Sequence, residues 1–136
     1  MEEYIKFIIV SIFVFLLDIG WILLNMNMYK EFIKTIQKSE FNVKYEYIIP
    51  AYFFVIFTFV YIAIPFTKFY LKSNDTVLDK FYKSFIYGGA VGFAAYGVYS
   101  FTCLTIFKDY SLFIALLDTL WGTIIGTSSV FLYTLL

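Results

Sequence analysis

Two hexapeptides of the chain share one chemical pattern, Leu-Leu-Asp followed by two residues and a Trp. They read LLDIGW at residues 16–21 and LLDTLW at residues 116–121, and each lies inside a long apolar run. The other eight acidic residues lie in connecting segments or near the N-terminus. A carboxylate at the centre of a membrane helix costs about 3 kcal/mol, and such residues mark ion, proton or ligand sites. Asp18 and Asp118 are therefore the first candidates for chemistry.

The two carboxylates need partners, because no lysine lies at their expected depth. One solution is that they are protonated; the other is that they share a proton or a cation and accept hydrogen bonds from neighbours. Hydrogen-bond donors are available in the third apolar run, where a spacing of three or four residues places side chains on one helix face. The candidates are Tyr96, Tyr99, Ser100, Thr102 and Cys103.

Trp21 and Trp121 each follow their Asp by three residues, which places ring and carboxylate on the same helix face. A buried indole N–H needs an acceptor. We expect each Trp either to donate to the Asp of the opposite helix or to line an aromatic pocket around a cation. The alternative is a pair of belt tryptophans at the lipid interface, and the matching depth of the two copies argues against it.

The composition indicates that these residues lie in a membrane. The 136-residue chain is 62% hydrophobic and 24% aromatic, with a mean hydropathy of +0.82. A soluble domain of this size could not bury so much apolar surface, so the lipid bilayer is the expected partner.

The charged residues narrow the chemistry further. The formal net charge is zero, which gives no electrostatic basis for binding nucleic acid. All ten basic residues are Lys and none is His, so His-based catalysis and His metal sites are excluded, and no metal or other cofactor is expected. Cys103 is the only cysteine, so no intrachain disulfide can form.

Four apolar runs must position the two aspartates. They cover approximately residues 4–28, 47–66, 81–107 and 111–136, and each holds the roughly 20 residues that a bilayer core requires. The acidic start and the length of the first run favour a membrane helix over a cleaved signal peptide. The predicted fold is one all-α transmembrane domain, residues 1–136: a four-helix bundle with both termini on the same side. Five lysines fall on each side, so the positive-inside rule gives no orientation.

The depth of the two carboxylates follows from this topology. At about 1.5 Å per residue, Asp18 lies near the midplane, and Asp118 lies roughly 10 Å into the fourth helix from the opposite side. The two side chains are therefore expected at similar depth, where they can face each other across the bundle.

The segment between the first two runs, approximately residues 29–38, has its own pattern. Tyr29, Phe32, Ile33 and Ile36 recur at i, i+3, i+4 and i+7, with charged residues largely elsewhere. This predicts a short amphipathic helix at the interface. A connector resting on lipid is favoured over a lid or a partner surface.

Small residues indicate where helices approach closely. Gly88 and Gly92 in the third run, and Gly122 and Gly126 in the fourth, have the Gly-x-x-x-Gly spacing. We expect packing of the third helix against the fourth; a homodimer through the same faces is the alternative.

With these motifs in order, the chain resembles the domain-of-unknown-function 2177 (DUF2177) family of small membrane proteins. That family shows Asp-x-x-Trp in the first helix, Tyr-Asp-x-Thr-Asn in the third, Lys-Asp-Trp in the following turn and Asp-x-x-Trp-Gly in the fourth. The matching positions are Asp18, Trp21, Tyr99, Thr102, Lys108, Asp109, Asp118, Trp121 and Gly122.

The chain departs from the family pattern at three places. Ser100 stands where the family has Asp, Cys103 where it has Asn, and Tyr110 where it has Trp. The resemblance implies a four-helix membrane protein and assigns no reaction. It also implies that this chain lacks a third intramembrane carboxylate.

Three functions are compatible with these features. The leading hypothesis is a semi-buried polar site, formed by Asp18, Asp118 and the third-helix hydroxyls, that binds or transports a proton, a cation or a small polar or amine-bearing ligand. The second is a structural or assembly protein, for instance of a viral inner membrane, in which the Asp–Trp contacts only fix helix packing. The third and least supported is a membrane-embedded enzyme using the two aspartates as acid and base.

Overall fold

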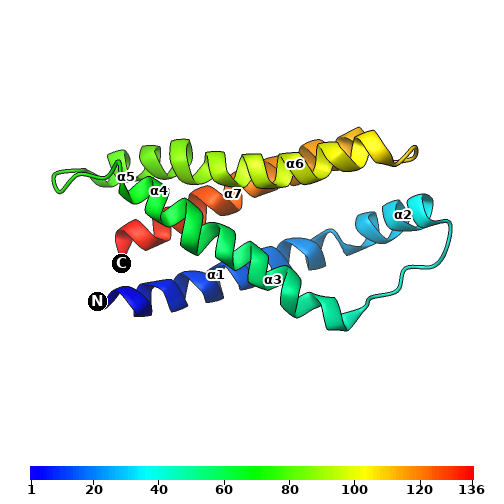
Figure 1. The fold of residues 1–136 in the computed structure, drawn as a ribbon, viewed down its shortest axis with the longest axis horizontal. Helices are drawn as coiled ribbons and strands as arrows, with labels where there is room; N and C mark the ends of the chain where they lie inside the picture. The colour runs from blue at the N-terminus through cyan, green and yellow to red at the C-terminus, as the bar shows by residue number, and fades with distance from the viewer.

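The computed structural model describes residues 1–136, and all of its regular elements are helices. Four helical spans are long and apolar enough to cross a membrane (Figure 1). The first is α1 (Glu3–Leu24) and the fourth is α7 (Leu112–Leu135). The second, Tyr45–Lys68, and the third, Val77–Ile106, are each built from several helical pieces. These pieces are η1 (Tyr45–Tyr47), α3 (Ile48–Phe57), η2 (Thr58–Ala63) and α4 (Ile64–Lys68), then α5 (Val77–Lys83), η3 (Ser84–Gly89) and α6 (Ala90–Ile106).

Both chain ends and the α4–α5 connection lie at one end of the bundle (Figure 1). The other end carries α2 (Met26–Gln37) and the turn between α6 and α7. At the terminal end, Lys68 Nζ lies 2.6 Å from Glu3 Oε1, and the Tyr133 hydroxyl donates to the same oxygen at 2.5 Å. These contacts tie α1, α4 and α7 together where the chain begins and ends.

The helix break at Asn25 gives the first apolar run its shape. The sequence predicts one run over residues 4–28, but α1 ends at Leu24 and α2 begins at Met26. The Asn25 side chain donates to the Trp21 carbonyl at 2.9 Å, which satisfies an acceptor at the end of α1. The break lets α2 take a direction of its own and turn its apolar face toward the rest of the bundle.

The second span, expected over residues 47–66, runs from Tyr45 to Lys68 and so continues through Pro65. Proline has no N–H to donate, so a carbonyl one turn earlier loses its partner. The π-helical segment η2 lies directly before Pro65 and accommodates this interruption. It also presents Phe59, a fully buried side chain, to the core.

The closest helix contact joins α7 to η3 and α6, and it depends on glycine. A Cβ atom placed on Gly92 would lie 1.8 Å from the Gly122 carbonyl oxygen, and one on Gly126 would lie 2.4 Å from that of Gly88. Both distances are impossible for a real side chain, so the backbones touch only because these residues lack one. This contact fixes α6 beside α7, with Tyr96 directed toward α1.

The α4–α5 connection is also well ordered by polar contacts. Thr76 and Asp79 form a reciprocal capping box at the start of α5, with Asp in the place usually taken by Glu. Asp75, whose side chain is nearly buried, pairs with Lys83 at 2.6 Å. The Lys83 ammonium holds the pKa of the Asp75 carboxyl below its ordinary value.

Candidate functional site

The two tryptophans of the repeated hexapeptides meet at the crossing of α1 and α7. Their rings stack with centroids 4.4 Å apart and an angle of 7° between the planes. Because each ring lies one turn from its own Asp, the stack brings both carboxylates to the same region of the bundle. From there the two aspartates have different surroundings.

Asp18 is enclosed. Its residue is only 7% exposed, and its Oδ1 atom accepts the Trp121 indole N–H at 2.9 Å and the Tyr96 hydroxyl at 3.3 Å. Tyr52 of α3 also approaches Asp18, but its buried hydroxyl lies outside the distance and angles of a regular hydrogen bond. Asp18 thus connects α1 to α6 and α7 with two different donors.

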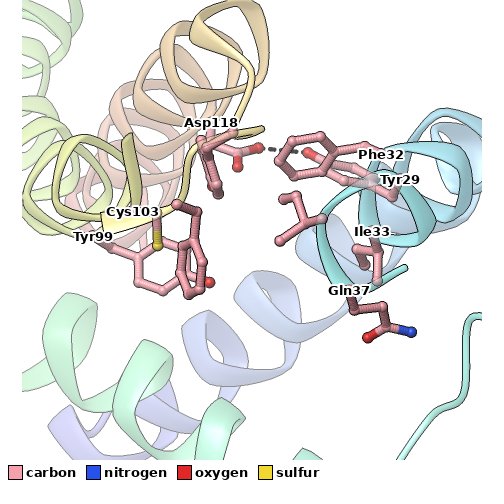
Figure 2. Close-up of a pocket in the computed structure, with 10 residues that line it drawn as sticks. Tyr29, Phe32, Ile33, Gln37, Tyr99, Cys103 and Asp118 are labelled. Carbon is pink, nitrogen blue, oxygen red and sulfur yellow. Dashed lines mark hydrogen bonds between the residues drawn. The ribbon is translucent and has the colours of Figure 1, made fainter. Parts of the chain in front are cut away.

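Asp118 is half-buried, and its hydrogen-bond partner lies on α2. The Tyr29 hydroxyl donates to Asp118 Oδ1 at 2.5 Å (Figure 2), and the Trp21 indole N–H donates to the Tyr29 oxygen at 3.1 Å. Burial, and the hydrogen bond to Asp118, raise the pKa of the Tyr29 phenol above its ordinary value. Tyr29 therefore remains a neutral donor to the carboxylate.

The repeated motif thus produces two unequal connections. Trp121 donates directly to the Asp of the opposite helix, as one of the two alternatives for the tryptophans predicts. Trp21 instead donates to Tyr29, which in turn donates to Asp118. The two carboxylates share no hydrogen bond and are linked only through the stacked indoles and Tyr29.

A cavity of about 270 Å³ opens beside Asp118. Figure 2 shows α2 side chains on one side, Tyr99 and Cys103 of α6 on the other, and Asp118 between them. Eight of the ten lining residues are hydrophobic, one is a carboxylate and none is basic. They are Tyr29, Phe32, Ile33, Ile36, Gln37, Tyr99, Cys103, Phe107, Tyr110 and Asp118.

Two further contacts hold α2 over this cavity. The Phe32 and Tyr110 rings pack edge to face with centroids 4.9 Å apart, and Lys38 Nζ lies 2.9 Å from Asp109 Oδ2. The apolar face of α2 therefore forms a wall of the cavity. The sequence favours a connector resting on lipid; the structure gives α2 the position of a lid.

The side chains predicted for the site do not all lie together but form two groups, one at each aspartate. Tyr96 reaches Asp18, whereas Tyr99 and Cys103 line the cavity at Asp118. Ser100 is fully buried, and its hydroxyl has no partner. Thr102 is exposed and contributes to neither group.

Tyr29 and Tyr52 are the important residues that sequence reasoning did not assign to the site. Tyr52 gives no signal beyond being one tyrosine among 13. Tyr29 heads the amphipathic pattern of the first connection, four residues after Asn25. That pattern could have suggested it, since a polar ring at the start of an apolar face often bonds to the element that the face covers.

The structure contains no group of three or more His, Cys, Asp or Glu side chains that could hold a metal ion. The polar side chains at this crossing are two carboxylates, two indoles and several phenols.

The family comparison agrees with the motifs and with the four spans. A family model described as "Predicted membrane protein (DUF2177)" matches residues 4–135, nearly the whole chain. No curated protein and no solved structure matches. The chain is a multi-pass integral membrane protein that belongs to the DUF2177 family.

Proposed function

We propose that the protein binds a small cation at Asp118, in the cavity under α2, and that a protonated amine is the preferred form of this cation. One observation carries the proposal: Asp118 is the single charged group in a cavity that is otherwise mostly aromatic and aliphatic. An unbalanced carboxylate in such surroundings favours a bound positive charge.

The aromatic walls strengthen this preference. Phe32, Tyr99, Phe107 and Tyr110 surround the space next to the carboxylate, and ring faces attract organic cations by about 0.5–2 kcal/mol each. Lys38 is at the end of α2, where it is paired with Asp109. It is not among the residues that line the cavity and does not neutralise Asp118.

Asp118 also has one carboxylate oxygen without a hydrogen bond from the protein. Its only hydrogen bond from the protein goes to Oδ1, from Tyr29, which leaves Oδ2 available to an ammonium group. The hydrogen bond from Tyr29 to Asp118 can remain while a ligand binds, so binding does not require α2 to move away from the cavity.

The test compares Asp118→Asn with Asp18→Asn, two identical substitutions in the two copies of the motif. The amide keeps the shape and an acceptor oxygen but cannot ionise. Trp21 and Trp121 are the only tryptophans, so indole fluorescence of the detergent-purified protein reports on the site directly. We expect saturable binding of propylammonium to the wild type. The affinity of Asp118→Asn should be at least about tenfold lower, and that of folded Asp18→Asn nearly unchanged.

Equal affinity in the wild type and Asp118→Asn would refute the proposal, as would loss of binding only in Asp18→Asn. The stronger form of the proposal is transport. In that case the same amine should enter proteoliposomes containing wild-type protein faster than those containing Asp118→Asn. Binding without such uptake would restrict the function to binding.

The surroundings of Asp18 favour a second, structural role for the other copy of the motif. Asp18 is nearly inaccessible and joins three helices through Trp121 and Tyr96, which is what a packing contact requires. Under the structural alternative, neither Asp→Asn change alters ligand binding, and only stability responds. A homodimer through the glycine faces is not part of the proposal, because those faces already pack against each other within one chain.

A further inference from the structure

A second, larger cavity lies between the second and third spans. It has a volume of about 470 Å³, and its walls come from α3, η2 and α6. Seven of its eight lining residues are hydrophobic, and none is charged. They are Ala51, Phe54, Val55, Thr58, Phe59, Ala95, Tyr96 and Tyr99. Phe54 at its edge is 66% exposed, on a surface that lipid covers in a membrane, so this groove opens sideways toward the bilayer.

Tyr99 lines both this groove and the cavity at Asp118. Its side chain lies on the cavity wall opposite Tyr29 and Phe32 (Figure 2). Tyr99 is 65% exposed and makes no hydrogen bond to either aspartate. One tyrosine ring therefore lies between a space with a carboxylate and an apolar space that faces lipid.

From this arrangement we infer that the ligand is an amphiphilic amine with a single alkyl chain. Its ammonium group binds Asp118, and its chain passes Tyr99 and lies in the groove between α3 and α6. The ligand reaches the site laterally from the bilayer, while α2 remains closed over the cavity. This inference rests on the proposed function, because it takes the Asp118 cavity as the site of the charged group.

The groove is expected to contribute mainly by providing space for the alkyl chain of the ligand. An alkyl chain in lipid is already in apolar surroundings, so moving it into an apolar groove contributes little binding free energy. Selectivity then comes from fit: a site without the groove would exclude a long chain, whereas the groove accepts it. Affinities must accordingly be compared per mole fraction of amine in the detergent or lipid phase.

The experiment fills the groove and compares a long amine with a short one. Ala95 lines the groove one turn before Tyr99, whereas its neighbour Ala94, which is exposed like Ala95, lines neither cavity. We expect the wild type and Ala94→Phe to bind both propylammonium and dodecylammonium. Ala95→Phe should bind propylammonium within about twofold of the wild type but dodecylammonium about tenfold more weakly, the usual effect of an overfilled apolar space. Ala51→Phe, which fills the groove from α3, should show the same selectivity.

The possible outcomes separate this inference from the proposed function. The inference of an amphiphilic ligand is wrong if the wild type binds propylammonium but not dodecylammonium, or if both groove variants bind both amines normally. The proposed cation site at Asp118 is retained in either case. If both groove variants fail to bind either amine while Ala94→Phe binds both, the groove is not a separate site for the alkyl chain of the ligand, and the inference is again overturned. If the wild type binds neither amine, the proposed function fails, and this inference fails with it.

Discussion

Replacing each Trp of the repeated motif by Phe should have unequal effects on stability, although the chemical change is the same. Trp121 is 8% exposed, and its N–H bonds to a nearly buried carboxylate at 2.9 Å. Trp21 is half-buried, and its N–H bonds to the Tyr29 oxygen at 3.1 Å, while Tyr29 keeps its own bond to Asp118. Phe retains part of the ring stack in both cases, so the difference reports mainly on the hydrogen bond and on burial.

The magnitudes follow from what each change leaves behind. Trp121→Phe deprives Asp18 of its shorter hydrogen bond and leaves only the Tyr96 hydroxyl at 3.3 Å, a loss worth about 1–3 kcal/mol for a buried acceptor. Loss of part of the stack adds about 0.5 kcal/mol. We therefore expect a cost near 2 kcal/mol for Trp121→Phe. Trp21→Phe removes a neutral hydrogen bond within a membrane protein, on average about 0.6 kcal/mol, and loses the same part of the stack, so its cost should be near 1 kcal/mol.

The assay is reversible unfolding of the purified protein in mixed micelles of increasing SDS content, followed by far-ultraviolet circular dichroism. A double-mutant cycle with Asp18→Ala, which removes the acceptor, isolates the contact, because coupling between Asp18 and Trp121 should exceed that between Asp18 and Trp21 by about 1 kcal/mol. Equal costs for the two Trp variants, or a cycle with no coupling at Trp121, would refute the assignment of unequal roles.

Three further outcomes are expected. Gly92→Ala should lower the free energy of unfolding by about 3 kcal/mol, since its Cβ would meet a carbonyl of α7; Gly20→Ala, which meets nothing within 4 Å, should be neutral or stabilising. Tyr29→Phe should speed maleimide labelling of the single thiol, Cys103, about tenfold, because loss of the bond to Asp118 loosens α2 over the cavity; an unchanged rate would mean that α2 is not held there by Tyr29. The lowered pKa of Asp75 should stabilise the fold fully above its unfolded pKa of about 3.9 and progressively less as pH falls through the lower folded value; Asp75→Asn should abolish this acid-side loss of stability, as measured by thermal unfolding against pH.

The four-span architecture could be predicted because it depends on local properties of the chain. Apolar runs of about 20 residues and uncompensated intramembrane carboxylates are visible in the sequence itself. The capping box at Thr76 is equally local, and the structure shows it. Such features require no knowledge of which helix packs on which.

The position of α2 could not be predicted, because its apolar face fits lipid and protein equally well. The spacing of Tyr29, Phe32 and Ile33 establishes an amphipathic helix but not what covers it. That depends on the break at Asn25 and on the partners at the far end of the bundle, Asp109 and Tyr110. These contacts join residues more than 70 positions apart, which no short pattern encodes.

The difference between the two aspartates has the same origin and bears on function. Two identical Leu-Leu-Asp-x-x-Trp segments run in opposite directions through the bundle, so a symmetric arrangement would give each Asp the Trp of the other helix. Only one such bond forms, because Tyr29 from α2 lies between Trp21 and Asp118. The tyrosine occupies one oxygen of Asp118 and keeps the carboxylate beside a cavity instead of inside a packed contact. One copy of the motif therefore lies in a packed helix crossing and the other beside a cavity, and α2 accounts for this difference; under the proposed function, only the second copy takes the ligand.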